Sequence, residues 1–93
     1  MRRFEVIKLQ LKERNPEAIF LDDLDEALIG FATIQKNDLP VAIYSETRII
    51  EILREKNSWS YFETLDYFYQ NIDCASSKPH TPIIVTGLAP HTA

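Results

Sequence analysis

The chain has 93 residues, of which 45% are hydrophobic and 26% charged, and its formal net charge is −4 with a pI near 5.0. These values are ordinary for globular proteins and argue against a disordered or fibrous chain. An acidic chain lacks the basic footprint needed to bind phosphate backbones, so nucleic acid is disfavoured as a direct ligand.

The length suits one domain with one core, which we expect over residues 1–86 and followed by a flexible tail over 87–93. Cys74 is the only cysteine, which excludes an intrachain disulfide and fits a reducing compartment. The amino terminus lacks the apolar core of a signal peptide, and no run approaches the ~18 apolar residues of a membrane span. We therefore expect a cytoplasmic protein without a membrane partner.

The first expected element is a helix. Phe4, Ile7 and Leu11 recur at helical spacing, although the same segment also alternates apolar and polar residues as a strand would. Good helix formers, followed by the stop signal Asn15-Pro16, favour the helix. A strand stays the alternative for this segment.

The middle of the chain contains short apolar runs typical of strands. Ala18–Leu21 and Ala27–Ile34 suggest a hairpin, with the acidic stretch between them as its loop. Val41–Tyr44 follows as a third strand, and Ile83–Val85 is a short apolar run that can add a fourth. We expect these runs to form a small antiparallel sheet of three to four strands.

Two helices are expected between the third and fourth runs. Ser45 is a good N-cap for a helix that ends near Asn57. Ser60 and Glu63 fit the capping box that starts a second helix. The expected fold is therefore α+β: an N-terminal helix, the small antiparallel sheet, and this helix pair packed on one face. The second helix is expected to bury an apolar stripe of Phe62, Leu65, Phe68 and Ile72.

A characteristic order is formed by segments 19–30, 41–44, 49–53, 60–63, 67–68, 71–72 and 81–83. This order resembles that of a family of small uncharacterised cytosolic proteins of bacteria and tailed phages. The resemblance implies the same succession of helix, strands, helix pair and final strand, in a protein associated with mobile elements. It implies no activity and assigns no functional residues, and Ser45 stands where the family commonly has aspartate.

The acidic stretch is the best candidate for metal or acid–base chemistry. The group consists of Asp22, Asp23, Asp25 and Glu26, with His80 as a further candidate, and these residue types bind hard cations or act in hydrolysis. The spacing lacks the alternation and terminal glutamate of a calcium loop, and aspartates in a turn commonly cap their own backbone. We favour a solvated turn without a metal, and keep a small metal-dependent hydrolase as the alternative.

Other catalytic constellations are missing from the sequence. The chain has only two glycines, which excludes a P-loop and a dinucleotide-binding fingerprint in their usual forms. Neither Cys74 nor His91 lies in a recognisable catalytic or metal-binding motif. We expect no enzymatic activity and no cofactor.

Six of the ten aromatic residues lie between Trp59 and Tyr69. Trp59, Tyr67 and Tyr69 exceed what one buried stripe accommodates, and Trp and Tyr are enriched at interface hot spots. We expect an interaction protein, a modulator or adaptor that binds another protein or itself as a homodimer through these residues. A second alternative is an acidic mimic that inhibits a nucleic-acid-binding protein.

Overall fold

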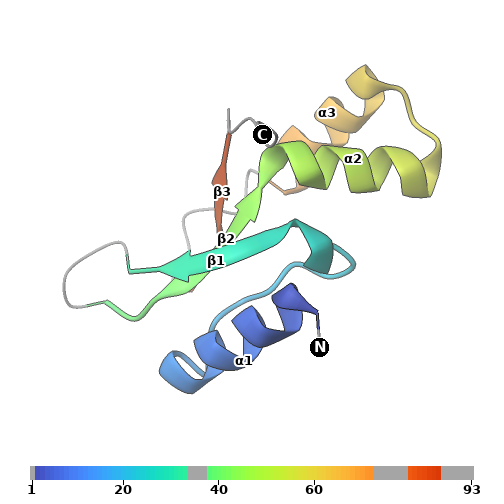
Figure 1. Cartoon of the computed structure of the whole chain (residues 1–93). Coiled ribbons are helices and arrows are strands. Elements are labelled where there is room, and N and C mark those ends of the chain that lie inside the picture. The colour runs from blue at the N-terminus through green and yellow to red at the C-terminus, as the bar shows by residue number, and fades with distance from the viewer. Residues whose placement is uncertain (1, 34–37, 73–79, 87–93) are drawn as a thin grey trace.

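The computed structural model describes residues 2–33, 38–72 and 80–86 (Figure 1). Its helices and strands confirm the predicted α+β class. The elements in chain order are α1 (Arg3–Arg14), the short 3-10 helix η1 (Asp25–Ala27), β1 (Leu28–Ala32), β2 (Val41–Ser45), α2 (Glu46–Asn57), α3 (Tyr61–Asn71) and β3 (Ile83–Val85).

Helix α1 confirms the helical interpretation of the first segment. At its start, the backbone N–H of Arg2 donates to a carboxylate oxygen of Glu5 at 2.8 Å. An acidic side chain is favourable there because the helix dipole is positive at its N-terminus. The helix ends at Arg14. The N–H of the C-cap residue Asn15 donates to the carbonyl of Leu11 at 2.7 Å, and Pro16 follows as the stop signal predicts.

Ala18–Leu21 is not a strand, so the hairpin predicted from this run is wrong. The N–H of Ile19 donates to the carbonyl of His80 at 3.2 Å, and the N–H of Leu21 donates to the Tyr44 hydroxyl at 2.9 Å. These isolated partners satisfy the backbone donors without the ladder of a neighbouring strand. The acidic stretch that follows is consequently a turn leading into η1 rather than a hairpin loop.

The sheet is mixed, with the strand order β1-β2-β3. β1 and β2 form the antiparallel hairpin, with a register shift between Leu28 and Gly30. β3 pairs with β2 in parallel and places Ile83 beside Ile43. The predicted antiparallel pairing is therefore wrong for the last strand. After β2 the chain passes through α2 and α3, and this crossover lets β3 run in the same direction as β2 (Figure 1).

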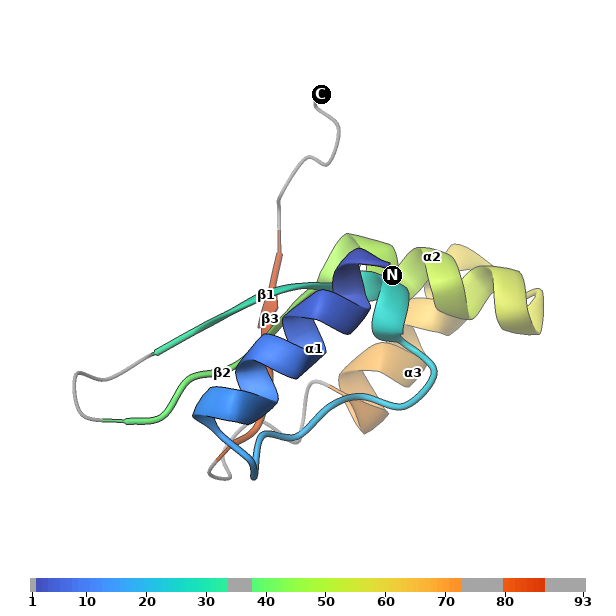
Figure 2. The ribbon, with the colours of Figure 1, turned by 60° about the horizontal axis from the view of Figure 1, so that its bottom comes forward.

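Both predicted helices of the pair are present. The Ser45 hydroxyl oxygen accepts from the backbone N–H of Arg48 at 3.3 Å, which confirms Ser45 as the N-cap of α2. Ser58 ends α2 in a left-handed conformation with φ of 57°, and the chain then turns into α3. Helix α2 contacts α3, β2 and η1, and α3 lies beside α2 in both views (Figures 1 and 2).

The core joins α1 to the sheet and to the helix pair. It draws on η1, β1 and β2 as well as on all three α-helices, so apolar area from most of the described elements is removed from water together. The buried cluster consists of Leu11, Leu24, Ala27, Leu28, Ala42, Tyr44, Ile49, Leu53 and Phe68.

The predicted tail over 87–93 lies outside the described residues, as do Cys74 and His91. Among the helices that the structure describes, none combines the length and the apolar character needed to cross a membrane.

Candidate protein-binding surface

The start of α3 is fixed by the capping box that the sequence predicts. The Ser60 hydroxyl oxygen accepts from the backbone N–H of Glu63 at 3.1 Å, and a Glu63 carboxylate oxygen accepts from the N–H of Ser60 at 2.8 Å. Both contacts satisfy N–H groups that a helix start otherwise leaves without partners. The first turn of α3, which carries Tyr61 and Phe62, is therefore held in a defined orientation.

The buried side of α3 is formed by Thr64 and Phe68. Thr64 is 0% exposed, and its hydroxyl donates to the carbonyl of Ser60 at 2.8 Å, so the polar atom is satisfied inside the helix. Phe68 is 1% exposed and belongs to the core cluster, while Ile72 packs against that cluster as a partly buried residue. The predicted core positions Phe68 and Ile72 thus contact the core, and Thr64 is a core residue that the apolar pattern did not indicate.

Phe62 was predicted to be in the core, and this prediction is wrong because its side chain is 79% exposed. An α-helix turns by about 100° per residue, which places Phe62 roughly 160° around the helix from Thr64 and 120° from Phe68. The side that these two residues bury therefore leaves Phe62 facing water. The apolar spacing alone could not reveal this, because a small threonine, rather than an aromatic residue, marks the centre of the contact.

Three exposed aromatic residues, Tyr61, Phe62 and Tyr69, form what we call the α3 aromatic surface. The rings of Tyr61 and Phe62 meet edge to face with centroids 5.7 Å apart. Tyr69 follows Phe62 by seven residues, or two helical turns, and therefore lies on the same side of α3. Tyr61 is 47% exposed and Tyr69 51% exposed, so large parts of both rings are accessible beside Phe62.

Trp59 and Tyr67 form a separate aromatic pair. Their ring centroids are 5.1 Å apart with an interplanar angle of 47°, and Trp59 is half-buried while Tyr67 is 40% exposed. Tyr67 and Tyr69 lie about 160° apart around the helix. The residues that the sequence groups as one binding surface, Trp59, Tyr67 and Tyr69, are therefore divided between two sides of α3.

Acidic side chains accompany the α3 aromatic surface. The sequence of α3 contains Glu63 and Asp66 but no lysine or arginine. The Tyr69 hydroxyl donates to a carboxylate oxygen of Glu46 at 3.4 Å, which brings a further acidic residue from the start of α2 to this surface. The charged side chains that α3 itself places around the exposed rings are thus acidic.

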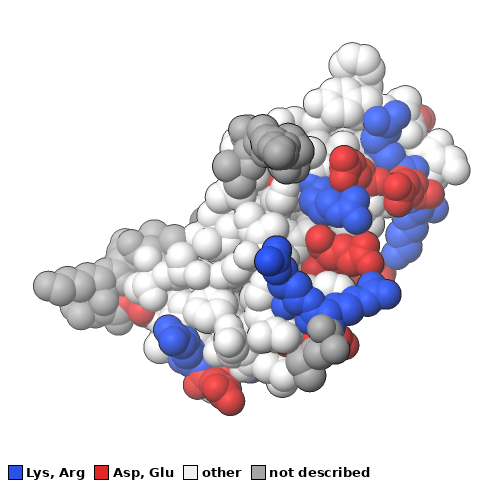
Figure 3. All heavy atoms as spheres, in the orientation of Figure 1, with Lys and Arg blue, Asp and Glu red and all other residues white. Residues whose placement is uncertain are grey.

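The acidic turn, residues 22–26, has different neighbours. Lys8 pairs with Asp25 at 2.6 Å, and Lys56 pairs with Asp23 at 3.2 Å. Glu26 pairs with Arg2 at 2.8 Å and with Arg48 at 3.3 Å. Figure 3 shows basic and acidic side chains interleaved on this face of the molecule. Cations from the N-cap of α1, from α1 and from α2 therefore pair with three of the four acidic side chains of the turn.

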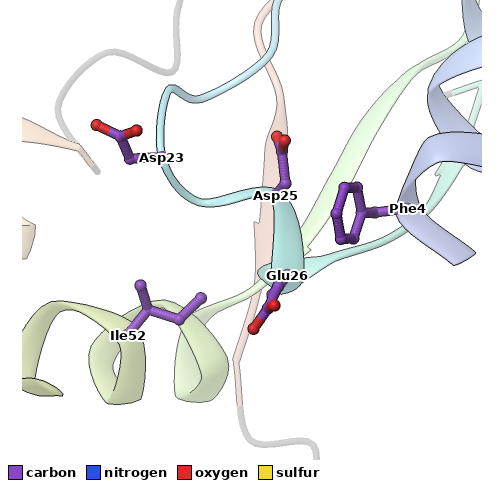
Figure 4. A pocket seen from close by; sticks show the side chains of 5 residues that line it. All are labelled: Phe4, Asp23, Asp25, Glu26 and Ile52. Carbon is purple, nitrogen blue, oxygen red and sulfur yellow. The ribbon is translucent and has the colours of Figure 1, made fainter. Parts of the chain in front are cut away.

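A pocket of about 310 Å³ lies beside the acidic turn and is lined by Phe4, Asp23, Asp25, Glu26 and Ile52 (Figure 4). The three carboxylates point in different directions rather than toward one centre. Among residues 2–33, 38–72 and 80–86, no group of three or more histidine, cysteine, aspartate or glutamate side chains is placed to hold a metal ion. Asp22, the other candidate ligand, is exposed on the turn.

His80, the imidazole considered with the acidic stretch, contacts a different residue. Its Nδ1 lies 3.1 Å from Nδ2 of Asn15, which is itself buried. In the sequence, Asn15 is recognisable only as part of a helix stop signal. A buried role for its side chain depends on partners far along the chain, so no local pattern could have indicated it.

Comparisons of the chain with models of protein families, with curated proteins and with solved structures found no match in any of the three.

Proposed function

We propose that this chain is a small, non-enzymatic cytosolic protein, a modulator or adaptor, that binds another protein through the α3 aromatic surface. The observation that carries the proposal is Phe62, a phenylalanine in a capped helix whose side chain is 79% exposed. A single exposed apolar residue is common, but here Tyr61 and Tyr69 extend the accessible ring area on the same helix.

The spacing of the exposed rings supports binding in a groove. Phe62 and Tyr69 are seven residues apart on one side of α3, which is the anchor spacing of a helix that lies in a hydrophobic groove of its partner. Aromatic anchors of this kind contribute much of the affinity at protein interfaces because they remove large apolar areas from water at small entropic cost. The helix is already formed, so binding does not require it to fold.

The charge around the rings indicates the chemistry of the partner. Glu46, Glu63 and Asp66 accompany the α3 aromatic surface, and α3 offers no cation. A partner groove with an apolar floor and a rim of lysine or arginine complements this surface. A second copy of the chain fits less well, because pairing two α3 helices brings acidic side chains together.

A photo-crosslinking experiment tests the proposal. The full chain carries p-benzoylphenylalanine at position 62, or at Tyr67 as the control on the other side of α3, and is irradiated in its native cytosol. We expect position 62 to crosslink one protein through an apolar segment that neighbours lysine or arginine. Crosslinks from the control position alone would place the interface at the Trp59–Tyr67 pair. If neither position gave a crosslink, the proposal would be overturned.

A pair of variants provides the equilibrium counterpart. Phe62→Ala combined with Tyr69→Ala should reduce capture of the crosslinked protein at least tenfold, as expected when two aromatic anchors are lost. Tyr67→Ala is the matched control and should leave capture within about twofold. Sedimentation of the wild-type chain should show a monomer, and a dimer that the double variant dissociates would assign the surface to self-association instead.

A further inference from the structure

Asn15 is a buried polar residue that joins three segments distant in the sequence. Its side chain is 0% exposed, and its Nδ2 donates to the carbonyl of Pro40 at 2.8 Å. The same Nδ2 lies 3.1 Å from Nδ1 of His80, and Oδ1 of Asn15 accepts from the backbone N–H of Glu17 at 3.1 Å. The end of α1, the approach to β2 and the approach to β3 therefore meet at one amide group.

These contacts determine the orientation of the Asn15 amide. The Pro40 carbonyl accepts only, so it requires the NH₂ group of Asn15, and the Glu17 N–H donates only, so it requires the oxygen. The second N–H of Nδ2 then faces His80. Nδ1 of His80 must accept this hydrogen bond, and only a neutral imidazole with its proton on Nε2 can do so.

We propose that the Asn15–His80 contact is a pH-sensitive latch that holds the β3 segment against the rest of the domain. Protonation of His80 places a hydrogen on Nδ1, opposite the N–H of Asn15, so two donors face each other. Rotating the amide of Asn15 does not relieve this, because its oxygen would then face the carbonyl of Pro40 and its NH₂ group would face the N–H of Glu17.

The latch acts on β3 because His80 is only three residues before Ile83, where the strand begins. The carbonyl of His80 also accepts from the N–H of Ile19, so the same residue is held by its side chain and by its backbone. Loss of the side-chain contact therefore loosens the entry to β3 and, through it, the parallel pairing with β2.

The charged neighbours along these segments do not compensate a protonated imidazole. Arg14 and Glu17 flank Asn15, and Asp38 precedes Pro40. Within the described residues, none of the three forms an ion pair with His80. The contact with Asn15 therefore stabilises the domain only while the imidazole of His80 is neutral, and protonation of His80 removes this stabilisation.

The backbone of His80 suggests a matched variant. His80 has φ of 66°, in the left-handed region that asparagine tolerates better than most residues. The side-chain oxygen of asparagine occupies a position close to that of Nδ1 in histidine and accepts a hydrogen bond at any pH. His80→Asn therefore keeps the contact with Asn15 while removing its titration.

The tautomer of His80 gives the first test. Nitrogen-15 chemical shifts of the imidazole in the wild-type chain at pH 7.5 should show Nε2 protonated and Nδ1 unprotonated. The chain has two histidines, so His91→Asn identifies the signals of His80. A predominant Nδ1–H tautomer, or rapid exchange between both tautomers, would overturn the latch.

The pH dependence of unfolding gives the second test. Between pH 7.5 and 5.0 the unfolding equilibrium constant of the wild-type chain should rise about tenfold more than that of His80→Asn, as expected for one lost hydrogen bond with two donors left opposed. Amide protection factors of β3 should fall in parallel in the wild-type chain and in His91→Asn, but not in His80→Asn. Equal pH dependence in the wild-type chain and His80→Asn would overturn the proposal.

Discussion

The acidic turn and the α3 aromatic surface differ in how the rest of the chain satisfies their side chains. In the turn, Asp23, Asp25 and Glu26 each pair with lysine or arginine from α1 or α2. On α3, Tyr61 and Phe62 contact each other but leave much of their apolar area exposed. One region has its electrostatic partners within the molecule, whereas the rings of Tyr61 and Phe62 in the other keep large exposed areas among the residues that the structure describes.

This difference indicates which of the two clusters is the better guide to function. A group of carboxylates suggests a metal site only where lysine or arginine side chains do not pair with it, because an ion pair balances the charge that a metal would otherwise balance. An ion pair cannot satisfy an exposed ring in the same way, because only another apolar surface removes the area of the ring from water. We therefore expect a ligand at α3 rather than at the acidic turn.

The largest difference we predict is between two phenylalanines of the same helix. Phe68→Ala should lower the free energy of unfolding by about 3–5 kcal/mol, because it empties a fully buried core position. Phe62→Ala should change it by less than about 0.5 kcal/mol, because that ring is largely exposed. Urea denaturation of both variants measures the two effects.

If both substitutions lowered the free energy of unfolding by similar amounts, the orientation of α3 would be contradicted, because one phenylalanine is buried and the other exposed. A Phe62→Ala variant that folds normally is also the condition for the capture experiment, since a lost interaction then cannot be attributed to a lost fold.

The second prediction concerns Tyr44, an aromatic residue that connects the core to the acidic stretch. Its ring is 0% exposed, and its hydroxyl oxygen accepts from the N–H of Leu21. Tyr44→Phe should lower the free energy of unfolding by about 1–3 kcal/mol, because it leaves that N–H without its acceptor. A neutral result in urea denaturation would show that another group replaces the hydroxyl.

Tyr44 also makes the stability of the domain depend on pH in the alkaline range. Burial raises the pKa of the Tyr44 hydroxyl above 10.0, the hydrogen bond from Leu21 opposes this shift, and the charges of Asp25 and Asp22 add to it. Because the raised pKa belongs to the folded state, the neutral hydroxyl stabilises the fold below about pH 10, and this contribution is lost as the pH rises through the folded-state pKa. Unfolding measured from pH 9 to 11 should show a steeper loss in the wild-type chain than in Tyr44→Phe.

The third prediction tests whether the α3 aromatic surface depends on its capping box. Ser60→Ala should lower the free energy of unfolding by about 1 kcal/mol and fray the first turn, because the N–H of Glu63 loses its acceptor. Ser60→Asp is the control that retains a capping oxygen. Amide exchange of residues 61–64 should increase in the alanine variant only.

The smallest effects should come from the acidic turn. Asp25→Asn removes the ion pair with Lys8 and should cost about 0.2–1 kcal/mol, because both side chains are partly exposed and screened by salt. Lys8→Gln should match it, with the double variant no worse than either single one. Calorimetric titration with Mg²⁺, Mn²⁺ or Ca²⁺ should show no site tighter than about millimolar, and a micromolar site would reopen metal-dependent hydrolysis.

The sequence was sufficient where structure depends on near neighbours. Ser45 and Ser60 were both identified as helix caps, because a cap needs only the following three residues. Asn15-Pro16 likewise indicated the end of α1 from local stereochemistry. These predictions succeeded because their partners lie within one turn of the chain.

The sequence was insufficient where partners are distant. The direction of β3 depends on the crossover through α2 and α3, and the irregular course of Ala18–Leu21 depends on Tyr44 and His80. The exposure of Phe62 depends on which side of α3 meets the core, a choice that the small residue Thr64 marks and the aromatic spacing does not. Tertiary packing overrides the local apolar pattern at each of these positions.

The parallel pairing of β3 with β2 has a consequence for the order of folding. β2 ends at Ser45 and β3 begins at Ile83, so their contact closes a long loop that contains both helices of the pair. Closing that loop costs entropy before the pairing stabilises the chain, whereas the β1–β2 hairpin and the individual helices form from contacts between near neighbours. We therefore expect β3 to join the sheet last, both in refolding and as the chain leaves the ribosome. Until it does, the edge of β2 that β3 will occupy remains open to strands of other chains.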